Sequence, residues 1–192
     1  MLFRSISEIG RWVLCTICEQ MRDWSARGFE MPRVAINLSA RQLANPGLVE
    51  DFREVISDSG IPPERIEFEI TESAIMDRPD EMIGMLRDLK AMGTRLAVDD
   101  FGTGYSSLSY LKRFPLDYIK IDRAFISDVM TNRIDADIVR TIIALAQALE
   151  VEVIAEGVET TLQRQFLKDM QCHYLQGFLL SKPVPEIGRA HV

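Results

Sequence analysis

The chain has 192 residues, of which 47% are hydrophobic and 27% are charged. A globular chain of this length buries roughly 70% of the surface that its extended form exposes, so it needs neither disulfides nor a structural metal to form a core. Its 22 basic and 29 acidic residues give a net charge of −7, which argues against a broad basic surface for a nucleic acid polymer. A small anionic ligand would need bound cations beside it.

The cysteines indicate a reducing compartment, because Cys15, Cys18 and Cys172 cannot all pair within the chain. Cys15 and Cys18 have C-x-x-C spacing inside a helical pattern, and we expect buried structural thiols there. No apolar run is long enough for a membrane span, and no signal peptide is visible. We therefore expect a cytoplasmic segment without membrane contact, although a longer parent could be anchored through other domains.

The two ends of the sequence resemble processing scars. Residues 1–5 can be back-translated as GTG CTC TTC CGA TCT and residues 186–192 as GAG ATC GGA AGA GCA CAC GTC, and both strings resemble sequencing adapters on opposite strands. We expect adapter-derived ends around a domain at residues 6–185, and we exclude them from fold reasoning. Short polar tails are the alternative, and the nucleotide sequence decides between them.

Between these ends, helical and strand-like segments alternate. Amphipathic or cap-flanked helices are predicted at Ser7–Ala26, Pro46–Ser59, Pro79–Met92, Asp135–Leu149 and Thr160–Met170. Runs rich in Val, Ile and Phe predict strands at Arg33–Leu38, Arg65–Ile70, Arg95–Asp99, Asp117–Ile121 and Glu152–Ala155, with a weaker one at His173–Phe178. This alternation predicts βα units around a parallel sheet in one α/β domain.

The number of strands limits the architecture. Six strands are too few for a closed eight-stranded βα barrel, and the chain begins with a helix. Either the sheet is open and doubly wound, or two strands are missing from the front of a barrel. The adapter hypothesis favours the second interpretation.

Polar residues stand at or just after the end of each predicted strand. They are Asn37, Glu69, Glu72, Asp99, Asp100, Lys120, Asp122, Glu156, Glu159 and Gln176. In a βα barrel these positions converge on the carboxyl face, where sites are built. Clustered carboxylates repel one another unless cations lie between them, and an all-oxygen donor set suits hard divalent ions. Two such ions about 3.5–4 Å apart can support phosphodiester cleavage, with Lys120 holding a water or a developing oxyanion.

Each of these residues also has an ordinary interpretation. Asp100 could cap a turn, and Asn37 could cap the next helix. Glu69 alternates with apolar residues as on a solvated strand face, and Lys120 could be a surface lysine with a buried stem. Only their joint arrangement at successive strand ends favours a site.

The motifs at these strand ends make the chain resemble the EAL domain family, the bacterial cyclic di-GMP phosphodiesterases. The resemblance rests on Asn37–Ala40, Glu69–Ser73, Asp99–Leu108, Lys120–Asp122, Ala155–Thr160 and Gln176–Phe178, in the family's order, and covers about Ile6 to Pro185. It implies a TIM-like (β/α) barrel, here incomplete, that hydrolyses cyclic di-GMP to linear pGpG with two Mg²⁺ or Mn²⁺ ions. It also implies a homodimer in the intact parent.

The resemblance assigns expected roles to individual residues. Asn37, Glu69 and Asp99 resemble ligands of the first metal, and Asp99 and Asp100 ligands of the second, with Glu156 close by. Lys120 resembles the residue that holds the attacking water, Glu156 the base or metal-water ligand, and Gln176 and Glu159 water-positioning residues. Glu72 resembles the anchor of the loop that couples dimerisation to the metal site, with loop residues Phe101, Gly102, Thr103, Gly104 and Tyr105.

The Glu-Ala-Leu motif that names the family does not occur in this sequence. In the family its glutamate is a metal ligand, and it belongs to a strand upstream of the first helix. We therefore expect this chain to be an inactive or weak fragment of the domain. The alternative is a non-catalytic module that binds cyclic di-GMP and passes the signal to a partner.

Overall fold

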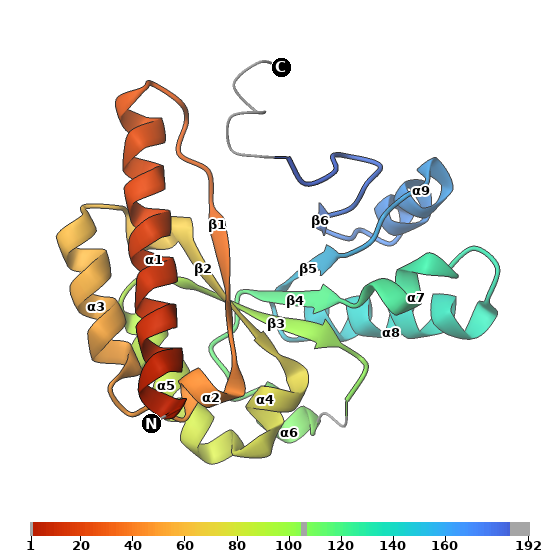
Figure 1. Cartoon of the computed structure of the whole chain (residues 1–192). Coiled ribbons are helices and arrows are strands. Elements are labelled where there is room, and N and C mark those ends of the chain that lie inside the picture. Colours follow the sequence, from red (N-terminus) through yellow and green to blue (C-terminus); the bar gives the residue numbers. More distant parts are fainter. Residues whose placement is uncertain (1, 105–106, 185–192) are drawn as a thin grey trace. The chain divides into compact units, whose positions relative to one another are not determined.

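A computed structural model describes residues 2–104 and 107–184, with only the backbone described for residues 2–5 (Figure 1). The chain divides into two compact units. The first comprises the residues up to Asp99 together with Gly104–Asp117, and the second comprises Asp100–Thr103 and the residues from Tyr118 onward. Tyr105, Met1 and the predicted scar at residues 186–192 lie outside the described residues.

The first unit is built on parallel strands that follow one another in chain order. β1 (Val34–Leu38) pairs with β2 (Ile66–Thr71), and β2 pairs with β3 (Arg95–Phe101), whose last two residues belong to the second unit. The helices of this unit are α1 (Leu2–Ala26), α2 (Ala40–Leu43), α3 (Leu48–Ser59), α4 (Glu72–Asp77), α5 (Pro79–Ala91) and α6 (Leu108–Leu111), with a short 3-10 turn, η1 (Pro63–Arg65). The predicted βα alternation is confirmed.

Local sequence signals explain where these helices begin and end. α2 begins at a capping box in which Ser39 and Gln42 exchange side-chain and backbone hydrogen bonds. α3 ends at Gly60, which has the left-handed φ of 69° that glycine adopts without strain. α1 lies beside α3 and buries Leu14, Cys18 and Met21 (Figure 1). This apolar stripe fixes α1 over the strands.

The second unit repeats the same pattern. β4 (Tyr118–Ile121), β5 (Glu152–Ala155) and β6 (Tyr174–Leu175) pair in parallel in that order. α7 (Arg123–Ser127) and α8 (Arg133–Ala148) connect β4 to β5, and α9 (Thr161–Asp169) connects β5 to β6. α8 buries Val139, Ile142, Ile143 and Ala146, as its predicted apolar periodicity requires. Each strand therefore delivers its carboxyl end to a loop that precedes a helix or a turn.

Several predicted boundaries were wrong. The last strand is only Tyr174–Leu175, so Gln176 lies just beyond β6 rather than on it. The chain turns there because Gly177 lies against the backbone of Val158, with no room for a side chain. The helices α2, α4, α6 and α7 were not predicted, and α1 begins at Leu2 rather than Ser7.

Within the described ranges, no helix combines the length and the apolar character needed to cross a membrane.

Candidate active site

Three predicted metal ligands lie on one face of the first unit's strands. The register pairs Asn37 of β1 with Glu69 of β2, and it pairs Thr71 of β2 with Asp99 of β3. Because directly paired residues share a face and residues two apart on a strand share a face, Asn37, Glu69 and Asp99 all project to the same side. All three lie in the carboxyl-terminal half of their strands, so the first unit by itself presents an amide and two carboxylates together.

Glu69 is not on a solvated face, since its exposed fraction is 7%. Every residue of β2 from Ile66 to Ile70 is buried, and Asp99 is half-buried. A buried carboxylate is stable only with hydrogen bonds or a compensating charge, so its burial contradicts the ordinary interpretation of the Glu-Phe-Glu alternation.

Asp100 has a left-handed backbone, with φ of 54°, inside β3. A non-glycine residue rarely adopts this conformation, and aspartate is among the few that tolerate it. Thr103 then closes the turn by donating its hydroxyl and its amide to the Asp100 carbonyl. The regular alternation of side chains along β3 is interrupted at this residue, as we expected for adjacent aspartates at a strand end.

In the second unit, Lys120 of β4 forms an ion pair with Glu156, with 2.7 Å between Nζ and Oε1. The Lys120 side chain is 3% exposed and the Glu156 side chain 20%, so the interpretation of Lys120 as a surface lysine was wrong. β4 and β5 place Lys120 opposite Ile154, two residues before Glu156, so the two side chains project to one face.

Gln176 follows the same alternation, because Tyr174 pairs with Ile154 and Gln176 comes two residues later. The Gln176 amide donates to the Ala155 carbonyl, and its own carbonyl accepts from the Val158 amide. The backbone of Gln176 is thereby fixed to the turn that carries Glu156. Glu159 lies at the far end of this turn, where it is exposed.

The loop after β3 is held by Glu72, the first residue of α4. Glu72 is 2% exposed and accepts a hydrogen bond of 3.3 Å from the Gly104 amide. A Cβ on Gly104 would lie 3.0 Å from the Glu72 carboxyl group, so a small residue permits this approach. Glu72 thus contacts the loop at Gly104, and its role as the loop anchor stays a prediction. Phe101 is buried, and Gly102 and Thr103 are exposed, in the second unit.

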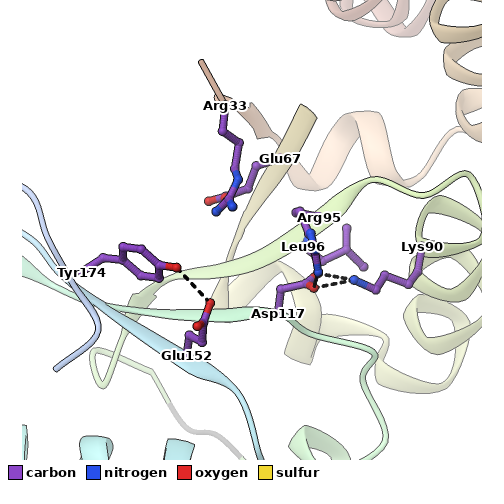
Figure 2. A network of polar contacts seen from close by, with 8 residues as sticks. All are labelled: Arg33, Glu67, Lys90, Arg95, Leu96, Asp117, Glu152 and Tyr174. Atoms are coloured by element: carbon purple, nitrogen blue, oxygen red, sulfur yellow. Dashed lines mark hydrogen bonds and ion pairs between the residues drawn. The ribbon is translucent and has the colours of Figure 1, made fainter. Parts of the chain in front are cut away.

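A second polar cluster lies at the amino ends of the strands in the first unit, and Figure 2 shows it. Asp117 accepts hydrogen bonds from Lys90, Arg95 and the Leu96 amide, and its own amide donates to the Leu96 carbonyl. Burial alone would raise the pKa of Asp117, but these hydrogen bonds outweigh it and hold the pKa below its ordinary value of 3.8. The cluster fixes the start of β3, the strand whose other end carries Asp99.

The donor set agrees with a hard divalent cation, since every predicted ligand offers oxygen. Within each unit the predicted carboxylate ligands occur in pairs, Glu69 with Asp99 in the first and Asp100 with Glu156 in the second. Among the residues that the structure describes, no group of three His, Cys, Asp or Glu side chains is spaced to hold a metal. The strand register places Glu69 and Asp99 on one face, and the complete ligand set stays a prediction.

No role was assigned to Asp117 and Gln163 from the sequence. Asp117 was placed on a strand without a role, although a charged residue directly before a buried strand was a usable signal. Gln163 is 6% exposed and hydrogen-bonds to the turn after Glu156. The T-x-x-Q spacing from Thr160 to Gln163 predicts a capping box, which the structure contains.

Comparison with known proteins identifies extensive similarity. The EAL domain family matches residues 2–183. The bifunctional diguanylate cyclase/cyclic di-GMP phosphodiesterase MucR of Pseudomonas aeruginosa is 46% identical over 180 residues, covering 94% of this chain and 26% of MucR. The cyclic di-GMP phosphodiesterase PdeR of Escherichia coli is 38% identical, covering 95% of this chain and 28% of PdeR. The chain thus spans about a quarter of these relatives.

Solved structures give the same result. The structure described as the PaMucR phosphodiesterase in complex with c-di-GMP superposes with a TM-score of 0.91 at 44% identity, covering 96% of this chain and 74% of that one. The EAL domain of Mycobacterium smegmatis DcpA gives a TM-score of 0.88 at 40% identity, covering 96% of this chain and 83% of that one. The predicted TIM-like (β/α) fold, with six strands among the described residues, is confirmed.

Proposed function

The chain belongs to the EAL domain family, and from this we propose that it is part of a divalent-metal-dependent phosphodiesterase domain that hydrolyses cyclic di-GMP to linear pGpG. Named relatives with this activity are 38% and 43% identical over almost the whole chain, which supports the assignment. The observation that carries the proposal is the register of β1, β2 and β3, which projects Asn37, Glu69 and Asp99 from one face.

Each half of the domain supplies a different part of the chemistry in this proposal. Asn37, Glu69 and Asp99 of the first unit would hold one Mg²⁺ or Mn²⁺ ion, and Asp99 and Asp100 would hold a second, with Glu156 close by. When bound, such ions neutralise phosphate oxygens and lower the pKa of a water molecule. The buried Lys120 ammonium would donate hydrogen bonds to the attacking water and fix its position.

In this proposal Glu156 receives a proton from that water. It already lies 2.7 Å from the Lys120 ammonium, so a water held by Lys120 is within reach of its carboxylate. In the proposed step the water oxygen bonds to phosphorus and the bond from phosphorus to the 3′ oxygen breaks. The leaving 3′ oxygen takes up the proton that Glu156 accepted from the water. Gln176 and Glu159 border the same turn and would orient water molecules there.

We further propose that the 192-residue chain alone hydrolyses cyclic di-GMP weakly or not at all. The sequence lacks the Glu-Ala-Leu motif, whose glutamate in the family is a ligand of the first metal. Losing one carboxylate from an oxygen-donor site weakens cation binding, because fewer negative charges offset the cost of removing water from the ion. The later family motif residues, from Asn37 to Gln176, are present.

The loop held by Glu72 would couple a homodimer of the intact domain to the metal site. The Gly104 amide bond to Glu72 supports this role, since the same loop continues from Asp99 and Asp100 along the chain. Tyr105, also assigned to this loop, lies outside the described residues.

The test incubates the purified chain with cyclic di-GMP and Mn²⁺ at enzyme excess and separates the products by chromatography. A second protein carries the two upstream strands of the MucR EAL domain, including its Glu-Ala-Leu motif, fused before residue 6. We expect slow or absent pGpG formation by the chain and rapid formation by the fusion.

Asp99→Asn in the fusion is the control, because it removes a predicted ligand charge without changing side-chain shape. A fusion that binds cyclic di-GMP in a thermal-shift assay but forms no pGpG would support the binding-module alternative. Normal turnover by the unfused chain would contradict the proposed weakness of the fragment.

A further inference from the structure

Gln163 lies in the first turn of α9, and both the oxygen and the nitrogen of its side-chain amide form hydrogen bonds that join two segments of the second unit. Its Oε1 accepts hydrogen bonds of 2.8 and 2.9 Å from the amides of Glu159 and Thr160. Its Nε2 donates bonds of 3.0 and 3.3 Å to the carbonyls of Ile126 and Ser127 at the end of α7. The side chain is 6% exposed, so water does not readily replace these bonds.

The segments that Gln163 joins begin at the two members of the ion pair. Lys120 lies on β4, and α7 starts after Asp122, so the carbonyls of Ile126 and Ser127 belong to the helix that follows the lysine. Glu159 and Thr160 end the turn that begins at Glu156. The β4–α7 segment and the turn after β5 are therefore joined at two places, by the Lys120–Glu156 ion pair and by Gln163.

The turn itself is packed against α7 at its centre. Gly157 has a φ of 70°, and a Cβ there would lie 2.0 Å from Cγ of Arg123. The Arg123 stem thus lies directly over the glycine backbone. The turn is held to the β4–α7 segment at Glu156, at Gly157 and, through Gln163, at Glu159.

Helix capping alone does not account for the Gln163 contacts. Gln42 occupies the equivalent position in the capping box of α2, where its Oε1 accepts from the backbone amide and the hydroxyl of Ser39. Gln163 makes the corresponding contact with Thr160 and adds the two bonds to α7. Glutamate serves equally well as the acceptor in a capping box, but it cannot donate to two carbonyls.

We propose that Gln163 is a positioning residue that fixes Glu156 and Glu159 relative to Lys120 by tying their turn to α7. The catalytic part of this proposal rests on the proposed phosphodiesterase function. The tie between the turn and α7 is a property of the fold and can be tested without catalysis.

The experiment compares Gln163→Glu with Thr160→Val by amide hydrogen exchange, measured by NMR on the full chain. Gln163→Glu keeps the acceptor for the Glu159 and Thr160 amides and loses the donors to α7. Thr160→Val removes the acceptor for the Gln163 amide and keeps the tie. Gln147→Glu, at an exposed position of α8, controls for the added charge.

We expect Gln163→Glu to speed exchange of the Glu156 and Val158 amides by about tenfold, while amides within α9 keep their protection. We expect Thr160→Val to speed exchange in the first turn of α9 and to leave Glu156 and Val158 unchanged. Gln163→Met, which loses both halves of the contact, replaces Gln163→Glu if the carboxylate prevents folding. If either Gln163 variant changes only the amides of Glu159, Thr160 and α9, Gln163 is a helix cap and the proposal is overturned.

Hydrolysis by the fusion protein adds the catalytic arm of the test. If Gln163→Glu displaces Glu156, kcat should fall by about tenfold while KM stays unchanged. Thr160→Val should change neither kcat nor KM. An unchanged kcat in Gln163→Glu, with the exchange result as expected, would overturn the catalytic role of the tie. Absence of hydrolysis in the unsubstituted fusion would refute the proposed function instead, and the exchange data would still decide whether Gln163 holds the turn.

Discussion

The substitution Asp117→Asn should destabilise the first unit, because it removes the charge at the centre of the cluster in Figure 2. The Asp117 side chain is 10% exposed and accepts bonds of 2.6 Å from Arg95 and 2.9 Å from the Leu96 amide, besides those from Lys90. A hydrogen bond to a charged group contributes about 1.5–3 kcal/mol. Because Lys90 and Arg95 are 32% and 41% exposed, water recovers part of this, and we expect a total loss of about 2–4 kcal/mol.

This loss should appear as a lower Tm in a thermal unfolding scan at pH 7. For a chain of this length each kcal/mol corresponds to roughly 2–4 °C, so Asp117→Asn should lower Tm by roughly 4–16 °C. Asp88→Asn, an exposed position on α5, is the matched control and should change stability by less than about 0.5 kcal/mol.

The pH dependence gives a sharper test of the same reasoning. The folded-state pKa of Asp117 lies below its ordinary value of 3.8, so the group contributes stability above that value and loses it as the pH falls through the folded pKa. The stability difference between the wild type and Asp117→Asn should therefore be full at pH 7 and narrow below about pH 4. A difference below about 1 kcal/mol at pH 7, or one that persists unchanged at pH 3, would refute the reasoning.

Three further outcomes follow from the second unit. Gly157→Ala should cost about 2 kcal/mol or more of unfolding free energy, because of its φ of 70° and the Arg123 stem at 2.0 Å. In denaturant titrations, adding Arg123→Ala should recover only the part of this loss that comes from the Arg123 stem. The part that comes from the φ angle should remain. Gly177→Ala should expose the C-terminal segment to limited proteolysis, because its Cβ would lie 2.2 Å from a backbone oxygen that cannot move aside. Lys120→Met in the fusion should lower single-turnover hydrolysis by about 100-fold or more and retain cyclic di-GMP binding, whereas equal losses of both would assign Lys120 to ligand binding.

The strands and long helices were predictable because they combine apolar periodicity with capping residues. The register of β1, β2 and β3 was not predictable, yet it is what places Asn37, Glu69 and Asp99 on one face. The alternative interpretations of Glu69 as a solvated strand residue and of Lys120 as a surface lysine were wrong, because both side chains are buried. Their alternation with apolar neighbours suits a half-solvated strand, but β2 and β4 are buried along nearly their whole length, so alternation does not identify a wet face.

Short elements escaped prediction for a different reason. α4 and α7 have six and five residues, too few to show a helical period, and their caps at Thr71 and Asp122 were the only signals. The early end of β6 depends on the approach of Gly177 to Val158, a contact between segments that the sequence places nineteen residues apart. The contacts of Gln163 with α7 likewise join distant positions and carry no local pattern.

The backbone at Asp100 limits which replacements evolution can sample there. Its φ of 54° is tolerated chiefly by glycine, asparagine and aspartate. A mutation to asparagine therefore abolishes the negative charge and spares the chain the conformational strain that alanine or valine would impose. Because the proposed role of Asp100 requires its charge, Asp100→Asn separates the effect of that charge from the effect of the turn.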